Sequence, residues 1–150
     1  MVLVMAALRT RVSATETGEG PYAVRIDTHD HSFVGDEPAS VGGGGLGPNP
    51  FELLTAALAE CTAMTVRWYA LQHGWPVEHI EVVVDHAKTV VVGATVPIDV
   101  FDKTVSIRAP LLGPDQVERL MEIAGKCPVH RVLEGLPIIR TKAAASIASY

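Results

Sequence analysis

The sequence of 150 residues lacks any cluster of lysine and arginine, and its formal net charge is −5. Proteins that bind nucleic acids neutralise phosphates with such clusters, so nucleic acid is not an expected partner. No apolar run approaches the ~18 residues of a membrane-spanning helix. The apolar start, residues 1–8, has no charged leader and is followed at once by Arg9, which is not typical of a signal peptide. We therefore expect a soluble, cytoplasmic protein with no membrane partner.

Cysteine is scarce, because the chain has only Cys61 and Cys127. Two cysteines do not form a disulfide framework, and cytoplasmic thiols are usually kept reduced, so any pairing is expected to be transient. The glycine-rich run at residues 42–45 lacks the helix start and the Lys-Ser/Thr pair of a phosphate-binding loop. We therefore predict that this run is a flexible linker and not a nucleotide site.

Apolar residues are abundant, at 48% of a 16.0 kDa chain. That is enough to bury one good core, so one domain over residues 1–150 is expected. Within it we place N-terminal strands in 1–40, a central helix in 50–73, and further strands and helices in 77–150.

A long helix is predicted over residues 50–72, and the rest of the chain is organised around it. Pro50 suits the first turn, because its missing N–H would have no partner there. Good helix formers follow until Gly74, which favours a left-handed stop, and Pro76 prevents the helix from resuming. The helix is apolar on nearly every side, which is typical of a buried central element.

Short strands and two further helices are predicted around this helix. Before it, an antiparallel meander is expected over residues 3–14, 22–27 and 32–34. After it, we expect strands over 79–86 and 98–109, a helix beginning at Pro114, a short helix within 126–133 and a closing strand over 136–147. This order indicates an α+β fold with antiparallel pairing, because no repeated strand-helix unit indicates a parallel sheet.

The two cysteines are the candidates for chemistry, and their surroundings differ. Cys127 precedes Pro128, which places it near the cap of a new helix, where exposed N–H groups stabilise a thiolate. Cys61 lies in the middle of the long helix on an apolar side, where desolvation raises a thiol pKa, so it needs a cation or a hydrogen-bond donor to react. The alternative is that both cysteines are small, buried and inert.

Two cysteine-centred strings resemble the OsmC/Ohr family of osmotically inducible and organic hydroperoxide resistance proteins. The first contains Gly47-Pro48-Asn49-Pro50, Glu52-Leu53-Leu54, Ala56-Ala57-Leu58 and Cys61-Thr62-Ala63-Met64-Thr65; the second contains Ala124, Cys127-Pro128-Val129-His130-Arg131 and Leu133. The cysteines are 66 positions apart, and the order of elements is similar over nearly the whole chain. The resemblance implies the OsmC-like fold, in which antiparallel sheets wrap around a long central apolar helix in an intertwined homodimer.

The same resemblance implies thiol peroxidase chemistry without a cofactor. Cys61 would attack an organic hydroperoxide and become a sulfenic acid, which would condense with the resolving Cys127 to a disulfide that a dithiol reduces. The apolar side of the helix favours an organic peroxide over hydrogen peroxide. The side chains expected to line the substrate pocket are Leu54, Leu58, Met64, Trp68 and His130.

One part of the family's pattern is absent from this sequence. In the well-studied peroxidases of the family, Glu follows Asn-Pro and pairs with an Arg from an N-terminal turn to activate the first cysteine. Here Phe51 stands at that position, Glu52 falls on the side of the helix opposite Cys61, and the turn at residues 17–21 has no Arg. Arg25 is the nearest candidate cation. These differences support an alternative function, a non-catalytic protein that binds a small hydrophobic or electrophilic ligand in the dimer pocket.

Cys127 and His130 also have the spacing of two metal ligands. A second close pair is missing, so no metal is expected. His130 lies one turn after Cys127, and we expect it to hydrogen-bond a thiolate instead.

Overall fold

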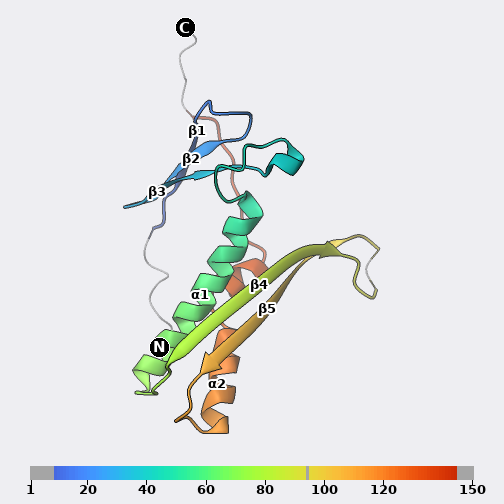
Figure 1. The fold of residues 1–150 in the computed structure, drawn as a ribbon. Helices are drawn as coiled ribbons and strands as arrows, with labels where there is room; N and C mark the ends of the chain where they lie inside the picture. The colour runs from blue at the N-terminus through green and yellow to red at the C-terminus, as the bar shows by residue number, and fades with distance from the viewer. Residues whose placement is uncertain (1–8, 94, 145–150) are drawn as a thin grey trace. The chain divides into compact units, whose positions relative to one another are not determined.

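The computed structural model describes residues 9–93 and 95–144. In chain order the elements are β1 (Ser13–Glu16), β2 (Val24–Asp27), β3 (Ser32–Gly35), the 3-10 helix η2 (Ala39–Val41), α1 (Pro50–Gln72), β4 (His79–Thr89), β5 (Ile98–Arg108), α2 (Pro114–Ala124) and α3 (Pro128–Glu134). The fold is α+β with two antiparallel sheets, as predicted (Figure 1). The described residues divide into two compact units, one within 1–56 and 86–99 and the other within 57–85 and 100–150.

α1 begins and ends as predicted, because local contacts satisfy the backbone groups at both ends. Asn49 Oδ1 accepts the N–H of Glu52 at 2.9 Å, and Glu52 Oε2 accepts the N–H of Asn49 at 2.8 Å. This reciprocal pair is a capping box. At the other end Gly74 has a φ of 63°, and the Trp75 N–H donates to the Ala70 carbonyl at 2.9 Å, as in a Schellman motif. Glu52 therefore caps the helix.

The first unit contains a three-stranded antiparallel sheet in the order β1-β2-β3. Ile26 in the middle strand pairs with Ala14 on one side and with Phe33 on the other. The connections between these strands are short (Figure 1). The predicted meander is therefore confirmed.

The first strand begins later than predicted. It was expected over 3–14 but covers Ser13–Glu16, and residues 1–8 lie outside the described part of the chain. Ser13 pairs with Asp27, the last residue of β2, so no part of β2 is left to pair with residue 12. A strand needs a hydrogen-bonded neighbour, and this register ends the strand at Ser13.

The glycine-rich run forms a loop closed around one buried carboxylate. Asp36 is 4% exposed and accepts the N–H groups of Glu37, Gly44 and Leu46 at 2.8, 2.9 and 3.2 Å. A Cβ at Gly43 would lie 1.8 Å from the carbonyl oxygen of Glu37, so only glycine allows this close approach. The prediction of a flexible linker is therefore wrong, because the sequence alone did not reveal the carboxylate that organises the loop.

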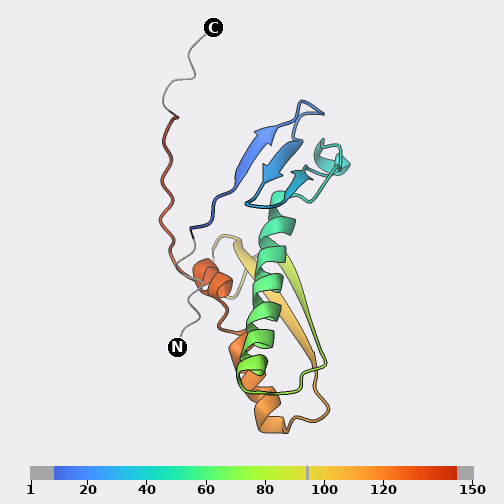
Figure 2. The ribbon, with the colours of Figure 1, turned by 90° about the vertical axis from the view of Figure 1, so that its left-hand side faces the viewer.

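In the second unit α1 packs with the β4–β5 hairpin and with α2 (Figure 2). Its core consists of Val66, Ala70, Val77, Leu120 and Ala124. α1 contributes one buried stripe with a spacing of four residues: Leu58, Thr62, Val66 and Ala70. This stripe follows the periodicity of an α-helix.

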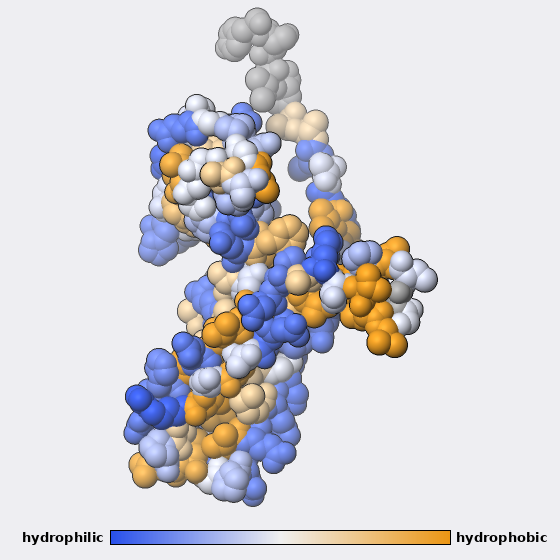
Figure 3. Space-filling view, turned by 45° about the vertical axis from the view of Figure 1, so that its right-hand side comes forward, coloured by the Kyte–Doolittle hydropathy of each residue, from blue (hydrophilic) through white to orange (hydrophobic). Residues whose placement is uncertain are grey.

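The other faces of α1 are less covered than the sequence suggested. Met64 is 55% exposed and Leu71 is 67% exposed, so within this single chain α1 is not buried on nearly every side. Apolar residues also gather at the end of the β4–β5 hairpin (Figure 3), where Val90 and Val96 are exposed. In the described residues, no helix is both long and apolar enough to cross a membrane.

The predicted closing strand is wrong over residues 136–144, which contain no strand. The rest of that prediction, 145–147, lies outside the described residues. Leu136 is 99% exposed, and Ile138 and Ile139 are exposed too. An apolar, β-branched pattern shows which side chains favour burial in a sheet, but it does not supply the neighbouring strand that pairing requires.

Candidate functional site

The two cysteines lie side by side in the second unit. Cys127 is the N-cap of α3, as predicted, and its Sγ accepts the N–H of His130 at 3.3 Å. Cys61 lies on α1, and both Cys127 and the backbone of Val129 in α3 act on its pKa, which places the Cys61 thiol beside the start of α3. The first turn of α3 therefore supplies an N–H group to Cys127 and lies next to Cys61.

The two thiols differ in their access to solvent. Cys127 is fully buried, at 0% exposure, whereas Cys61 is only partly buried. Burial is the main cause that raises the pKa of Cys61, and the neighbouring Cys127 raises this pKa further. The hydrogen bonds from Val129 and Thr65 lower it, but the net direction is upward. Cys61 is thus the accessible thiol, and its thiolate form is disfavoured near neutral pH.

Lys103 brings an ammonium group into the same cluster, and our sequence reasoning missed it. Lys103 lies on β5, and its Nζ donates to Thr62 Oγ1 at 3.1 Å and to the Ala124 carbonyl at 2.7 Å. Its third neighbour is Nδ1 of His130, also at 3.1 Å. Each ammonium hydrogen therefore has an acceptor, an arrangement that suits the charged form.

A sequence signal for Lys103 did exist in the alternation of β5. Phe101, Lys103, Val105 and Ile107 all lie on the less exposed face of that strand. Side chains two residues apart share a face of a strand, so a lysine in phase with apolar residues points toward the core. Lysine is seldom placed there without polar partners, which makes this position informative.

Thr62 links Lys103 to the buried thiol. Its Oγ1 lies 3.4 Å from Cys127 Sγ and donates to the Leu58 carbonyl at 2.8 Å. A hydroxyl has one hydrogen, so with that hydrogen on Leu58 the oxygen accepts from both Lys103 and the Cys127 thiol. The hydroxyl is therefore a bridge of one atom between the ammonium group and the sulfur.

His130 and Glu134 complete the cluster from α3. Nε2 of His130 lies 3.0 Å from Oε1 of Glu134, and its Nδ1 faces Lys103. When Nε2 carries the hydrogen and donates to the carboxylate, Nδ1 is free to accept from the ammonium group. The sequence predicted that His130 bonds a thiolate; its backbone N–H bonds Cys127, and its ring contacts Lys103 instead.

Lys103 is electrostatically coupled to the thiols. Burial is the main cause that lowers its pKa, because the charged form loses hydration. The charges of Cys127, Cys61 and Glu134 act in the opposite direction, with Cys127 the strongest of the three. A negative charge on the buried sulfur therefore favours the ammonium form of Lys103.

The predicted cation Arg25 belongs to the first unit. It lies on β2, where its Nε pairs with Asp27 at 3.0 Å and donates to Ser32 at 3.1 Å. Phe51, at the position where the family's peroxidases have Glu, stacks on the ring of His86 in the same unit, with ring centroids 4.7 Å apart. Both side chains thus have partners within that unit.

The predicted pocket residues are divided between the two units. Leu58, Met64, Trp68 and His130 belong to the second unit with Cys61, whereas Leu54 belongs to the first. Leu58 is buried, Trp68 and His130 are partly buried, and Met64 is exposed.

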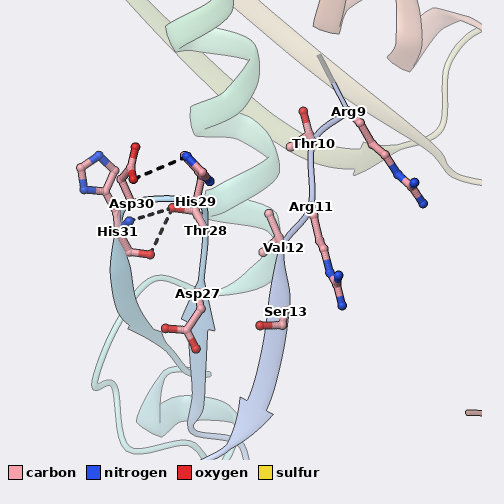
Figure 4. Close-up of a pocket in the computed structure, with 10 residues that line it drawn as sticks. All are labelled: Arg9, Thr10, Arg11, Val12, Ser13, Asp27, Thr28, His29, Asp30 and His31. Atoms are coloured by element: carbon pink, nitrogen blue, oxygen red, sulfur yellow. Dashed lines mark hydrogen bonds and ion pairs between the residues drawn. The ribbon is translucent and has the colours of Figure 1, made fainter. Parts of the chain in front are cut away.

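A separate open hollow of about 850 Å³ lies in the first unit (Figure 4). It is lined by residues 9–13 and 27–31, and the side chains of Arg9 and Arg11 point away from its carboxylates. This hollow has no cysteine and is not the thiol site. Within the described part of the chain, no group of three or more His, Cys, Asp or Glu side chains is arranged to hold a metal ion.

Comparison with known proteins identifies the fold. The family model described as OsmC-like protein matches residues 42–142. Among solved structures, an OsmC-like protein from Mycoplasma pneumoniae has a TM-score of 0.70 and 14% identity, over 87% of this chain and 90% of that chain. An organic hydroperoxide resistance protein OsmC from Legionella pneumophila has a TM-score of 0.65 and 20% identity, over 87% and 92%.

The organic hydroperoxide resistance protein OhrB of Bacillus subtilis has a TM-score of 0.57 and 22% identity, over 85% of this chain and 92% of that chain. No curated protein sequence is significantly similar to the chain. At these identities the structural matches establish the fold, which is OsmC-like as the sequence predicted.

Proposed function

The chain belongs to the OsmC-like family, and on that premise we propose that it is a thiol-dependent peroxidase that reduces organic hydroperoxides. The observation that carries this proposal is that an accessible thiol, Cys61, has a fully buried one, Cys127, as its interacting neighbour. The names of the Legionella and Bacillus structures, both organic hydroperoxide resistance proteins, support the same substrate class.

The reaction has two oxidative steps and one reductive step. The Cys61 thiolate attacks the O–O bond, which breaks; an S–O bond forms, and the alcohol leaves after taking up a proton. The sulfur of Cys127 then attacks the sulfenic sulfur of Cys61, so that an S–S bond forms, the S–O bond breaks and water leaves. A dithiol reductant reduces the disulfide by thiol–disulfide exchange and restores both thiols.

Access to solvent supports the assignment of these roles. A peroxide arriving from solvent meets Cys61, because Cys127 has no exposed surface. Cys127 in turn needs no access to solvent, since a resolving thiol attacks the sulfur of a neighbouring residue. Leu58 and Met64 lie within one turn of Cys61 on α1, and such apolar neighbours favour an organic peroxide.

We further propose that the protein acts as a cytoplasmic homodimer of the intertwined type. The exposed apolar side chains of α1, Met64 and Leu71, need cover that their own unit does not provide. Obligate dimers bury surfaces that resemble a divided core. Sedimentation should find a dimer, and a folded monomer at micromolar concentration would contradict this assembly.

Trapping of the sulfenic acid tests the proposed function. Reduced Cys127→Ser protein, treated with cumene hydroperoxide and then with dimedone, should carry the dimedone adduct on Cys61. Cys61→Ser protein should consume no peroxide and carry no adduct. An adduct on Cys127 in the second variant, and none in the first, would exchange the two roles. If the wild-type protein leaves the peroxide untouched, the ligand-binding alternative is favoured.

A further inference from the structure

We propose that Lys103 is a positioning residue for the resolving thiol: oriented by His130 and Glu134, its ammonium group stabilises the thiolate of Cys127 through Thr62 and through its charge. This inference rests on the proposed function and deepens it. It assigns the cation of this site mainly to disulfide formation and less to the attack on peroxide.

The contacts of Lys103 leave its charge available. Its three partners are the hydroxyl of Thr62, the carbonyl of Ala124 and Nδ1 of His130, and all three are neutral acceptors. A carboxylate in direct contact would neutralise the ammonium group, whereas neutral acceptors only hold it in place. An anion that forms beside this group is therefore stabilised by a positive charge that has no carboxylate among its three hydrogen-bond partners.

Thr62 carries that effect to Cys127. Its hydroxyl oxygen lies 3.1 Å from the ammonium nitrogen and 3.4 Å from the sulfur. When the thiol loses its proton, the hydroxyl hydrogen turns from the Leu58 carbonyl to the thiolate. Lys103 continues to donate to the same oxygen, which strengthens the new bond because a polarised hydroxyl is a better donor. Lys103 keeps its own protons throughout.

His130 and Glu134 set the orientation of the ammonium group. The carboxylate of Glu134 accepts from Nε2, 3.0 Å away, and thereby selects the histidine tautomer whose Nδ1 accepts from Lys103. The titratable groups around the Cys127 sulfur are then Cys61 from α1, Lys103 from β5, and His130 with Glu134 from α3. Lys103 is the group among these that contributes a lasting positive charge.

The resolving step needs no further reactant. The Cys127 thiolate attacks the sulfenic sulfur of Cys61, the S–S bond forms, and the S–O bond breaks. The hydroxide that leaves takes up the proton that Cys127 released and becomes water. In the reductive step, a dithiol attacks the exposed sulfur of the disulfide and expels Cys127 as a thiolate. The same ammonium group stabilises that leaving group.

A kinetic experiment separates the two oxidative steps. Reduced wild type, Lys103→Met and the control Lys126→Met are mixed with one equivalent of cumene hydroperoxide, and remaining peroxide and disulfide are measured in quenched samples. Lys126 precedes Cys127 in sequence but is exposed, so the control removes a lysine charge close in sequence without changing the cluster. In Lys103→Met, disulfide formation should slow about 10-fold or more, as for the loss of a nearby cation.

Peroxide consumption should slow less in Lys103→Met, so the Cys61 sulfenate accumulates and dimedone captures it. The Lys126→Met control should behave like wild type. Equal slowing of both steps in Lys103→Met, or no slowing of either, would overturn the proposal.

A second experiment uses no peroxide and so separates this proposal from the proposed function. In a Cys61→Ser background, Cys127 is the sole thiol, and its thiolate is followed by ultraviolet absorbance against pH. Lys103→Met should reduce the thiolate fraction about 10-fold at a fixed pH below the midpoint, and Lys103→Arg should restore part of it.

An unchanged titration in the Lys103→Met background would overturn the role of Lys103 even if wild type reduces peroxides. Where Lys103→Met does not fold, Lys103→Gln, which keeps polar contacts without the charge, decides both experiments with the same expectations.

Discussion

Asp36 in the first unit and Lys103 in the second each lie in a polar cluster, and the two clusters are built differently. In the first unit, Asp36 takes its three N–H partners from within ten residues of its own position. In the second unit, Lys103 takes its partners from 21 to 41 residues away, on α1, α2 and α3. Asp36 closes a local loop, whereas Lys103 brings a charge to a thiol that the fold places beside it.

The hydrogen-bond partners of the two charged groups also differ in kind. Backbone N–H groups of its own loop surround the Asp36 carboxylate and hold the loop closed. Neutral acceptors hold the Lys103 ammonium, and a buried sulfur lies one hydroxyl away. We infer that a charge satisfied by its own loop serves stability and that a charge assembled from distant elements next to a reactive group serves chemistry.

The largest expected effect on stability lies in the first cluster. Asp36→Ala leaves three N–H groups of the loop without their charged acceptor and should lower the free energy of unfolding by about 3 kcal/mol. The rate of peroxide reduction per folded molecule should be unchanged. Urea unfolding followed by circular dichroism, with Asp30→Ala as an exposed control, measures the first effect. A stable Asp36→Ala protein with slowed chemistry would break the comparison.

The pH dependence of the attack on peroxide tests the same comparison at Cys61. Its pKa is raised, chiefly by burial, so the thiol form predominates at neutral pH and the thiolate fraction grows as pH rises. The rate of peroxide consumption should therefore increase about 10-fold per pH unit below that pKa. Stopped-flow measurement with cumene hydroperoxide gives the profile. A rate independent of pH around neutrality would mean that a cation outside the described cluster activates Cys61.

Arg25 remains a candidate for such a cation. The matched variant Arg25→Met should then lower a rate that is otherwise independent of pH. If the wild-type rate rises with pH as expected, Arg25→Met should change it little, because the guanidinium group pairs with Asp27.

The smallest expected effect concerns the cap of α1. Asn49→Ala removes one half of the capping box with Glu52 and should lower the free energy of unfolding by about 1 kcal/mol. Peroxide reduction by the folded protein should not change, because Glu52 caps the helix and does not activate a thiol. A loss of activity at unchanged stability would assign Glu52 to the chemistry instead.

The ends of the helices could be predicted from the sequence because their signals are local. Pro50 and Gly74 mark the limits of α1, and Cys127-Pro128 marks the start of α3. The pairing of the two cysteines could be predicted from the resemblance to the family, because each cysteine lies within a short, specific string. Local rules of capping and periodicity therefore carried most of the fold.

The remaining features depend on contacts between distant residues. The role of Lys103 can be inferred only once the fold places β5 beside α1 and α3. The strand expected over 136–147 required a neighbouring strand, which the sequence does not identify. The glycine-rich run has the composition of a linker, whereas the carboxylate that organises it, Asp36, precedes the run and contacts it only in the folded loop. Periodicity gives the face on which a residue lies, but not the group that meets it there.

Thiol counting with peptide mapping tests the central claim, that Cys61 and Cys127 form one redox pair, most directly. Reduced wild-type protein is treated with one equivalent of cumene hydroperoxide, its free thiols are counted, and its peptides are mapped without reduction. The account predicts that both thiols disappear together and that a single link joins the peptides of Cys61 and Cys127. Two thiols still free, or Cys61 oxidised to a sulfinic acid beside a free Cys127, would contradict it.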